Sequence, residues 1–379
     1  MNKGLLLLVA GIKGAIGSTL AVAAQSLQNN PDSILPYLMT NQKFAHLGDP
    51  THIEMAGWDC SNRSMPEAVR QHQVIADHLW KPFESALTAI PTVTAPNPQM
   101  KLAEQIQMLA NQLKQFCSDF PDHQPVFINL LPAGSCHDLH GYTTLNALRA
   151  LDAPVAIPDL AYAVAAIESG VPVVNFTPNE IEIPAVILAA QTNGVPLAGR
   201  DGKTGQTYLK VVLASALRAR HLLVNGWYSA NILGNADGEN LMDPDHAACK
   251  LTNKTDVLEN VLGYTPGQKR YGKSVHKVVI DYYPPRGDAK EAWDVIDFEG
   301  IMGLKMSLRL NLQGRDSVLA VPMILDLARW AAALGRKGMT GPIPELAFYF
   351  KAGIADVVPY TFEEQLAALD RLEREIDGV

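Results

Sequence analysis

Two lysines four residues apart, Lys250 and Lys254, are the first candidates for chemistry in this chain. Residues with this spacing lie on one face of a helix, and two like charges there destabilise it. An anion bound between the two ammonium groups would offset their repulsion, so the pair is a candidate site for a small anionic substrate. The alternative is a basic helix face exposed to solvent.

A glycine-rich stretch at Gly199–Thr207 contains the tripeptide Gly-Lys-Thr, which invites comparison with phosphate-binding P-loops. A P-loop needs a glycine five residues before Gly202, and this chain has Leu197 there. The stretch therefore argues against a nucleotide kinase. A glycine-rich turn ahead of a helix can still bind a phosphate or diphosphate, and Thr204 and Gly205 lie in this one.

Two further motifs place charged side chains at the ends of expected elements. Pro284–Lys290 follows an apolar strand directly, so Asp288 and Lys290 stand at a strand end, where active sites gather. The stretch Gly314-Arg-Asp-Ser317 precedes an apolar helix, and Asp316 is predicted to be its N-cap. A polar stretch at Asn231–Asn240 supplies further amides and acids, namely Asn235, Asp237 and Asn240.

Gly11, Gly14 and Gly17 recur every three residues between a buried apolar run and an Ala-rich helix. Glycines in such a turn let the backbone approach a pyrophosphate, which the N–H groups of the helix then favour. Lys13 occupies the place of the second glycine of the usual motif, and an outward-pointing lysine there can bind the phosphates. Asp59 is predicted to accept hydrogen bonds from the adenosine ribose and to favour NAD over NADP. The alternative is an ordinary tight turn.

The segment Gly4–Ser26 also resembles a secretory signal, because Lys3 precedes an apolar run and small residues follow it. Only eight apolar residues, Leu5 to Ile12, precede Lys13. The glycine spacing therefore favours the first strand, turn and helix of a cofactor domain.

The composition narrows the function classes. The chain has 379 residues, a net charge of −8 and 47% hydrophobic residues, so it can bury a large core, and its acidity argues against broad nucleic-acid binding. Its four cysteines lie far apart, which indicates free thiols in a reducing compartment. We expect no membrane span. No residue spacing is typical of a metal site, and we predict none.

Short apolar strands alternate with helical segments in the first half of the chain, which predicts an α/β fold with a Rossmann-like, doubly wound parallel sheet. After about residue 197 the pattern favours a second, α+β domain with a large sheet. We predict a cofactor domain at 1–196 with 309–379, and a catalytic and oligomerisation domain at 197–308. The expected strands are 5–10, 52–58, 126–131, 154–157, 171–176, 221–228 and 276–283, and the expected helices are 18–27, 99–117, 208–218 and one that follows a capping box at 361–364.

Seven motifs, in this order, resemble the inositol-phosphate synthase family, whose members convert glucose 6-phosphate to an inositol monophosphate. They extend over nearly the whole chain, and the ordered set is far more specific than any one of them. They are Gly-x-x-Gly-x-x-Gly-Ser-Thr at 11–19, Gly-Trp-Asp at 57–59, Val-Asn-Phe-Thr-Pro at 174–178, Gly-x-Asp-x-Lys-Thr-Gly-Gln-Thr at 199–207, Leu-Gly-Asn-x-Asp-Gly-x-Asn-Leu at 233–241, Gly-Asp-x-Lys at 287–290 and Asp-Ser-x-Leu-Ala-x-Pro at 316–322.

The resemblance implies roles for individual residues. It implies that four lysines and several aspartates form the catalytic site, with Asp316 orienting a lysine or lying on the nicotinamide side. The implied catalytic residues are Lys250, Lys254, Lys290, Lys351, Asp237 and Asp316. The implied cofactor-binding residues are Gly11, Lys13, Gly14, Ala15, Ile16, Gly17, Asp59, Asp201 and Asp316. The implied substrate-binding residues are Thr204, Gly205, Asn235, Asn240, Lys250 and Lys254.

The reaction that the resemblance implies is NAD-dependent and redox-neutral. C5 is oxidised, C6 loses a proton and attacks C1, and the hydride then returns. Ammonium groups in a dry pocket stabilise the enolate and alkoxide oxygens that develop. The resemblance further implies a cytoplasmic homotetramer that binds a sugar phosphate and NAD, with a divalent or monovalent cation as a possible addition. Two alternatives stay open: a net NAD-dependent sugar-phosphate dehydrogenase and a non-catalytic dinucleotide-binding sensor.

Overall fold

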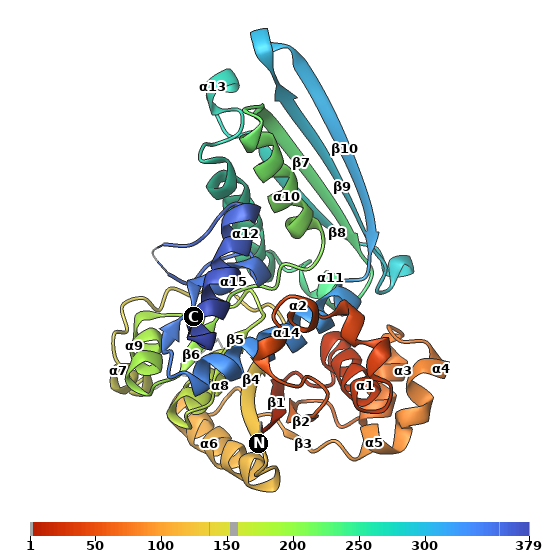
Figure 1. Ribbon diagram of the computed structural model, residues 1–379, viewed down its shortest axis with the longest axis vertical. Helices are drawn as coiled ribbons and strands as arrows, with labels where there is room; N and C mark the ends of the chain where they lie inside the picture. Colours follow the sequence, from red (N-terminus) through yellow and green to blue (C-terminus); the bar gives the residue numbers. More distant parts are fainter. Residues whose placement is uncertain (1–2, 136, 152–157, 356, 379) are drawn as a thin grey trace.

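The computed structural model describes residues 3–135, 137–151, 158–355 and 357–378, and for residues 247–255 it describes the backbone alone. The expected strand at 154–157 lies outside the described residues. The chain forms a lower body around one sheet and an upper arm around a second sheet (Figure 1).

The first sheet has seven parallel strands in the order β11-β6-β5-β4-β1-β2-β3. This order confirms the predicted doubly wound sheet. Its strands are β1 (Gly4–Ala10), β2 (Ile53–Asp59), β3 (Thr92–Thr94), β4 (His123–Asn129), β5 (Val173–Asn175), β6 (Pro196–Ala198) and β11 (Gly341–Pro342).

β1 lies at the centre of this sheet and is buried along its whole length. Leu5, Leu7 and Val9 belong to the core on one face, which α1 (Ala15–Asn29) and α14 (Asp316–Arg336) cover. Leu6 and Leu8 belong to the core on the other face, which α6 (Leu102–Asp119), α8 (Asp159–Glu168) and α9 (Pro184–Thr192) cover. A strand covered on both faces has no polar side, and this explains its continuous apolar run.

Short helices complete this body. Asp326 of α14 accepts hydrogen bonds from the backbone N–H groups of Met39 and Thr40, and so fixes the segment between α1 and β2. The short helices are α2 (Met39–Gln42), α3 (Met65–His72), α4 (Asp77–Trp80), α5 (Glu84–Thr88), α7 (Leu145–Arg149), η1 (Pro31–Ser33), η2 (Leu35–Tyr37), η3 (Ala45–Leu47), η4 (Lys81–Phe83) and η7 (Pro344–Tyr349).

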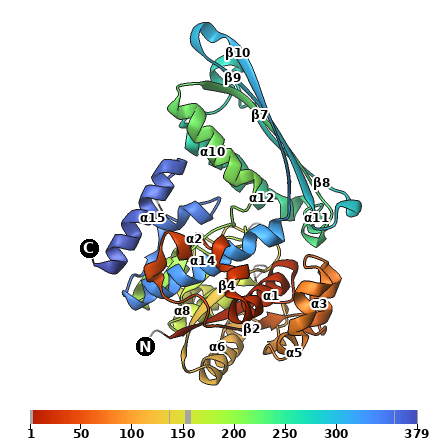
Figure 2. The same cartoon turned by 45° about the vertical axis from the view of Figure 1, so that its right-hand side comes forward.

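The second sheet has the order β10-β9-β7-β8, in which only β7 and β8 pair in parallel. Helices α10 and α12 lie along one face (Figure 2). The strands are β7 (Leu223–Leu233), β8 (His276–Tyr282), β9 (Lys290–Glu299) and β10 (Lys305–Gly314), and the helices of this region are α10 (Gln206–Ala219), α11 (Ala236–Asn240), α12 (Pro244–Leu262) and α13 (Gln268–Tyr271).

Two sequence expectations bear on this part of the fold. β10 pairs with β9 from Lys305 to Gly314, so the second sheet continues past the predicted boundary at residue 308. α14 is long and apolar enough to cross a membrane by those criteria alone, although no such segment was expected from the sequence. Most of its apolar window is buried, which identifies it as a core helix.

The last helix, α15 (Phe362–Asp377), begins at the predicted capping box. The Thr361 hydroxyl accepts from the Glu364 N–H, and the Glu364 carboxylate accepts from the Thr361 N–H. Its apolar face, with Leu369, Leu372 and Ile376, packs into the core of the lower body.

Candidate active site

A cavity of about 1030 Å³ opens where the carboxyl ends of β1, β2, β4 and β5 face the second sheet. Parallel α/β sheets bind ligands at this edge. Of the residues singled out from the sequence, the cavity is lined by Gly11, Lys13, Gly14, Ala15, Ile16, Gly17, Asp59, Asp201, Thr204, Asn235, Asp237, Asn240, Lys290, Asp316 and Lys351.

Three residues predicted from the sequence are not among the lining residues that the structure describes. Gly205 does not appear in the lining and is the N-cap residue of α10. Lys250 and Lys254 both lie on α12, as their spacing predicted. Their side chains lie outside the described part of the chain.

The glycine turn at the end of β1 packs closely against neighbouring backbone and brings the start of α1 to the cavity. Gly11 has a φ of +78°, and a Cβ there would lie 2.9 Å from the Leu130 carbonyl oxygen. A Cβ on Gly17 would lie 2.4 Å from the Ile12 carbonyl oxygen, so α1 can pack this closely only with glycine. α1 begins at Ala15 and has no side-chain cap on its N–H groups. A pyrophosphate therefore fits at this helix end.

Asp59 and Lys13 join this turn to the loop after β2. The two Asp59 carboxylate oxygens accept from the backbone N–H groups of Lys13 and Ser61, each at 2.8 Å. The Lys13 ammonium donates to the Ser61 carbonyl oxygen at 2.8 Å. The expectation that this lysine points outward to the phosphates therefore differs from the structure, in which its side chain lies along the β2 loop.

At the other end of the cavity, Lys290 and Asp316 form an ion pair of 2.9 Å. The second Asp316 oxygen accepts from the Thr204 hydroxyl, also at 2.9 Å. Burial opposes ionisation of Asp316, but the Lys290 ammonium and the Thr204 hydrogen bond outweigh it and hold the pKa of Asp316 well below its usual range. Asp316 therefore holds the Lys290 side chain in place.

Asp316 is not the N-cap of α14, contrary to the expectation from sequence. Arg315 takes that position, and Asp316 is the first helical residue. The other acid of this region, Asp288, accepts from the Ser317 hydroxyl at 2.7 Å and from Arg315 Nε at 3.1 Å. These bonds hold the start of β9 against the start of α14, which places Lys290 beside Asp316.

A second buried ion pair joins Lys351 and Asp201 at 2.6 Å, with side-chain exposures of 8% and 4%. The Lys351 backbone N–H also donates to the Asp201 carbonyl oxygen at 2.8 Å. The charge of Lys351 further lowers the pKa of Asp316, so both ion pairs act on the same part of the cavity. This end of the cavity thus has two positioned ammonium groups among the described residues.

The amides of the 231–240 stretch also have structural partners. The Asn235 side chain accepts from the Gly238 N–H at the start of α11. Asn240 donates to the Ala133 carbonyl oxygen at 2.8 Å, and its own oxygen lies 3.0 Å from His246 Nδ1. Both side chains line the cavity, and their predicted contact with substrate stays a prediction.

Sequence reasoning missed an acid in the cavity wall, Asp159. One of its oxygens accepts from Asn129 and Asn179, at 2.7 and 2.9 Å, and the other has no hydrogen-bond partner among the described residues. Complete burial raises the pKa of Asp159. The sequence signal for this polar cluster was the alternating series Asn175, Thr177 and Asn179, which begins at the last residue of β5.

The lysine of the Gly-Lys-Thr tripeptide, Lys203, does not line the cavity. Its ammonium donates to Gln365 Oε1 at 2.7 Å and to the Ala347 carbonyl oxygen at 3.2 Å. Burial lowers the pKa of Lys203 to about 7. Lys203 therefore ties the loop after β6 to α15 and is not a phosphate-binding P-loop lysine.

Lys203 gives a prediction for stability against pH. Its folded pKa lies below that of an unfolded lysine, so between about pH 7 and pH 10 the unfolded chain binds more protons, and the free energy of unfolding rises with pH. The rise from one group is at most about 1.4 kcal/mol per pH unit. We expect denaturant unfolding at about pH 7, 8 and 9 to give a smaller slope for Lys203→Met than for the wild type. Equal slopes would contradict a depressed pKa.

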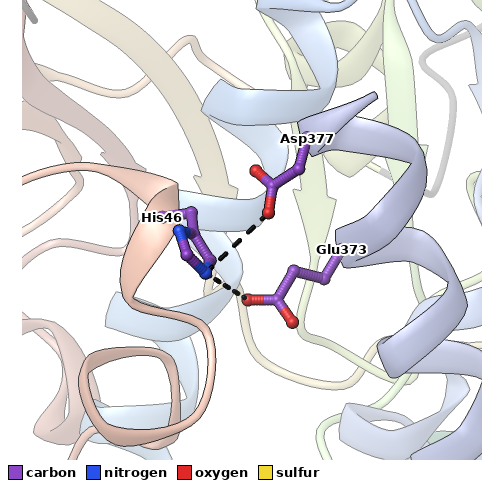
Figure 3. Close-up of side chains that lie close together, drawn as sticks. All are labelled: His46, Glu373 and Asp377. Atoms are coloured by element: carbon purple, nitrogen blue, oxygen red, sulfur yellow. Dashed lines mark ion pairs between the residues drawn. The ribbon is translucent and has the colours of Figure 1, made fainter. Parts of the chain in front are cut away.

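Far from the cavity, His46 of η3 lies near Glu373 and Asp377 of α15 (Figure 3). The distances from His46 Nε2 to the two carboxylates are 3.7 and 3.9 Å. Within the described ranges this is the one group of three side chains that could hold a metal ion. His46 and Asp377 are exposed, and the group is explained as a surface ion-pair cluster.

The fold and cavity define a Rossmann-like α/β protein with a second sheet domain and a lysine- and aspartate-lined site. Residues 205–317 match the family model described as myo-inositol-1-phosphate synthase. An inositol-3-phosphate synthase of Bacteroides thetaiotaomicron is 33% identical over 366 residues, which cover 91% of this chain and 84% of that protein. The chain belongs to the inositol-3-phosphate synthase family.

One further sequence comparison and two structural comparisons agree with this assignment, and the structural ones do so at the level of the fold. The human inositol-3-phosphate synthase 1 is 32% identical over 74% of this chain, which spans about half (54%) of the human protein. The crystal structure of inositol-3-phosphate synthase from Caenorhabditis elegans has a TM-score of 0.87 at 20% identity, covering 99% of this chain and 86% of that one. A synthase-related protein from Thermotoga maritima has a TM-score of 0.78 at 20% identity, covering 99% of both chains.

Proposed function

We propose that this chain catalyses the NAD-dependent, redox-neutral cyclisation of glucose 6-phosphate to a myo-inositol monophosphate. The observation that carries the proposal is that one cavity holds a glycine turn suited to a dinucleotide and, at its other end, two positioned lysine–aspartate pairs. Hydride transfer alone needs no such set of cations. An enolate and an aldol alkoxide need them.

The cofactor is assigned to the turn at the end of β1. The N–H groups at the start of α1, which no side chain caps, would face the pyrophosphate, and glycine at positions 11 and 17 allows the tight turn that brings α1 there. Asp59 lies at the end of β2 and would lie beside the adenosine ribose. Bound NAD supplies the hydride acceptor for C5 and later the hydride donor.

The lysines are assigned to the oxygens of the substrate that become negative. Lys290 and Lys351 lie near the C5 oxygen, where they stabilise the enolate formed when C6 loses its proton. Lys250 and Lys254 are assigned to the phosphate and the C1 oxygen. C6 then bonds to C1, the C1 oxygen takes up a proton, and reduction at C5 makes the overall reaction an isomerisation. Asp316 positions Lys290 for this work.

Two other activities compete with this one, a net sugar-phosphate dehydrogenase and a non-catalytic dinucleotide sensor. The dehydrogenase shares the glycine turn and the lysines, but it forms no ring. The sensor needs neither ion pair. Product analysis after incubation with glucose 6-phosphate and NAD separates the three: a cyclic inositol phosphate supports the synthase, an oxidised sugar phosphate supports the dehydrogenase, and no product supports the sensor.

We also propose that the chain forms a homotetramer through the open face of the second sheet. Side chains of β7 and β9 alternate, so Asp294 and Ile296 face α10 while Trp293 and Val295 face outward beside Tyr228. Trp293 and Tyr228 are 40% and 43% exposed, and exposed aromatic side chains on neighbouring strands of an open sheet face support an interaction site there.

Replacing Trp293 with arginine is expected to shift the sedimentation coefficient toward that of a smaller species, because the charge would be desolvated in the interface. Tyr37→Arg, at an exposed aromatic of the lower body, is the matched control and should keep the wild-type size. A wild type that sediments as a monomer, or a Trp293→Arg variant that keeps the wild-type size, would exclude this interface.

A further inference from the structure

The loop that follows β6 contacts both ion pairs of the cavity. Its Asp201 belongs to one pair, and its Thr204 hydroxyl donates to the aspartate of the other at 2.9 Å. Lys203 lies between these two residues in the chain, and its ammonium donates to Gln365 of α15. We propose that Lys203 and Gln365 are positioning residues, whose contact fixes this loop and through it the geometry of both lysine–aspartate pairs. The inference rests on the proposed function, because it concerns turnover at that site.

Backbone hydrogen bonds join the same loop to the segment that carries Lys351. The Lys203 N–H donates to the Tyr349 carbonyl oxygen, and the Lys351 N–H donates to the Asp201 carbonyl oxygen, both at 2.8 Å. The residues between them form an antiparallel bridge. Because the two segments are paired in this way, a shift of the loop at Lys203 would move Asp201 and Lys351 together. One ion pair of the cavity would then be displaced relative to the other.

The Lys203 side chain lies outside the cavity, against α15 and η7. It is 2% exposed, and its ammonium donates to Gln365 Oε1 at 2.7 Å and to the Ala347 carbonyl oxygen at 3.2 Å. Both acceptors are neutral, and among the described residues Lys203 forms no ion pair. Burying an ammonium group without a counter-charge opposes folding. Overall stability therefore does not account for this lysine, whereas the position that it fixes does.

Gln365 is a rigid acceptor because its amide nitrogen and its helix are also held. The side chain is 5% exposed, and its nitrogen donates to the carbonyl oxygens of residues 359–360 at 3.3 and 3.2 Å. Carbonyl oxygens only accept, so the amide nitrogen faces them and the amide oxygen faces Lys203. At the start of α15, the Phe362 N–H donates to the Ser215 hydroxyl of α10 at 2.9 Å. The first turn of α15 therefore forms a fixed anchor for the loop.

Loss of this contact is expected to misplace the loop without unfolding it. Lys203→Met keeps a side chain of similar length and removes its donors, while the backbone bonds to the 349–351 segment remain. A displacement of about 1 Å within an active site can cost about 10²-fold in rate. Neither Lys203 nor Gln365 lines the cavity. The cost should therefore fall on kcat, with little change in the binding of substrate or NAD.

The test measures kcat and KM for glucose 6-phosphate, from the inositol phosphate that the full-length protein forms, and NAD affinity by isothermal titration calorimetry. The variants are Lys203→Met, Gln365→Leu and the two combined. We expect each single change to lower kcat by about 10–100-fold, with KM and NAD affinity altered by less than about threefold. The double variant should lose no more than the worse single one, because both changes remove the same contact.

Leu372→Ala, at a buried position further along α15, is the matched control. It should lower the midpoint of urea unfolding but keep the wild-type kcat when assayed where the protein is folded. Folded Lys203→Met or Gln365→Leu with kcat within about twofold of the wild type would overturn the inference and leave the proposed function standing. So would losses that multiply in the double variant, or an equal loss of kcat in Leu372→Ala. A wild type that forms no inositol phosphate overturns the proposed function and this inference with it.

Discussion

Replacing Lys290 with alanine is expected to lower turnover of glucose 6-phosphate by about 10²–10³-fold, the usual cost of removing one preorganised donor that stabilises a developing oxyanion. The Lys290 side chain is only 11% exposed and is fixed by Asp316 at 2.9 Å. Because it is already oriented and partly dehydrated before substrate binds, its interaction with an enolate oxygen requires little reorganisation.

The control for this prediction is Lys337→Ala, which removes the same charge from an exposed position outside the cavity. It should turn over at the wild-type rate. Circular dichroism and denaturant unfolding of Lys290→Ala establish that the variant is folded. Activity near that of the wild type in a folded Lys290→Ala protein would remove this lysine from the catalytic site.

Much of the first sheet could be predicted from the sequence because local patterns determine it. The apolar run of β1 and the glycine spacing after it placed the first strand, turn and helix correctly, and the capping box placed the start of α15. Strands of two or three residues, such as β3, β6 and β11, are fixed by their neighbours in the sheet and carry little pattern of their own.

The second sheet shows where local pattern fails. β7 runs to Leu233, five residues past the predicted end, because Ser229 is buried against Asp294 and not exposed. β10 was not expected at all. Its residues alternate between exposed and half-buried, and pairing with β9 stabilises it as an edge strand. Such tertiary partners outweigh intrinsic strand preference.

The candidate site depends on partners that lie far apart in sequence. Lys290 and Asp316 are 26 residues apart, and they meet because the β9–β10 hairpin pairs Lys290 with Gly314. Lys351 and Asp201 are 150 residues apart. The family resemblance named these four residues, but which lysine pairs with which aspartate follows only from the fold.

The largest effect that the proposed function predicts concerns the fate of NAD. If the hydride taken from C5 returns to the same molecule, each NAD supports many turnovers, and no NADH accumulates in solution. A dehydrogenase that shares this glycine turn must instead consume one NAD for each substrate oxidised. The two ion pairs at the far end of the cavity favour the first outcome, because they supply cations that hydride transfer does not need.

The most direct test of the synthase assignment follows NADH absorbance and inositol phosphate together, with excess glucose 6-phosphate and limiting NAD. The assignment predicts that inositol phosphate far exceeds the NAD supplied, while NADH absorbance stays flat. NADH growth in step with substrate loss, with no cyclic product, would contradict it and leave a sugar-phosphate dehydrogenase.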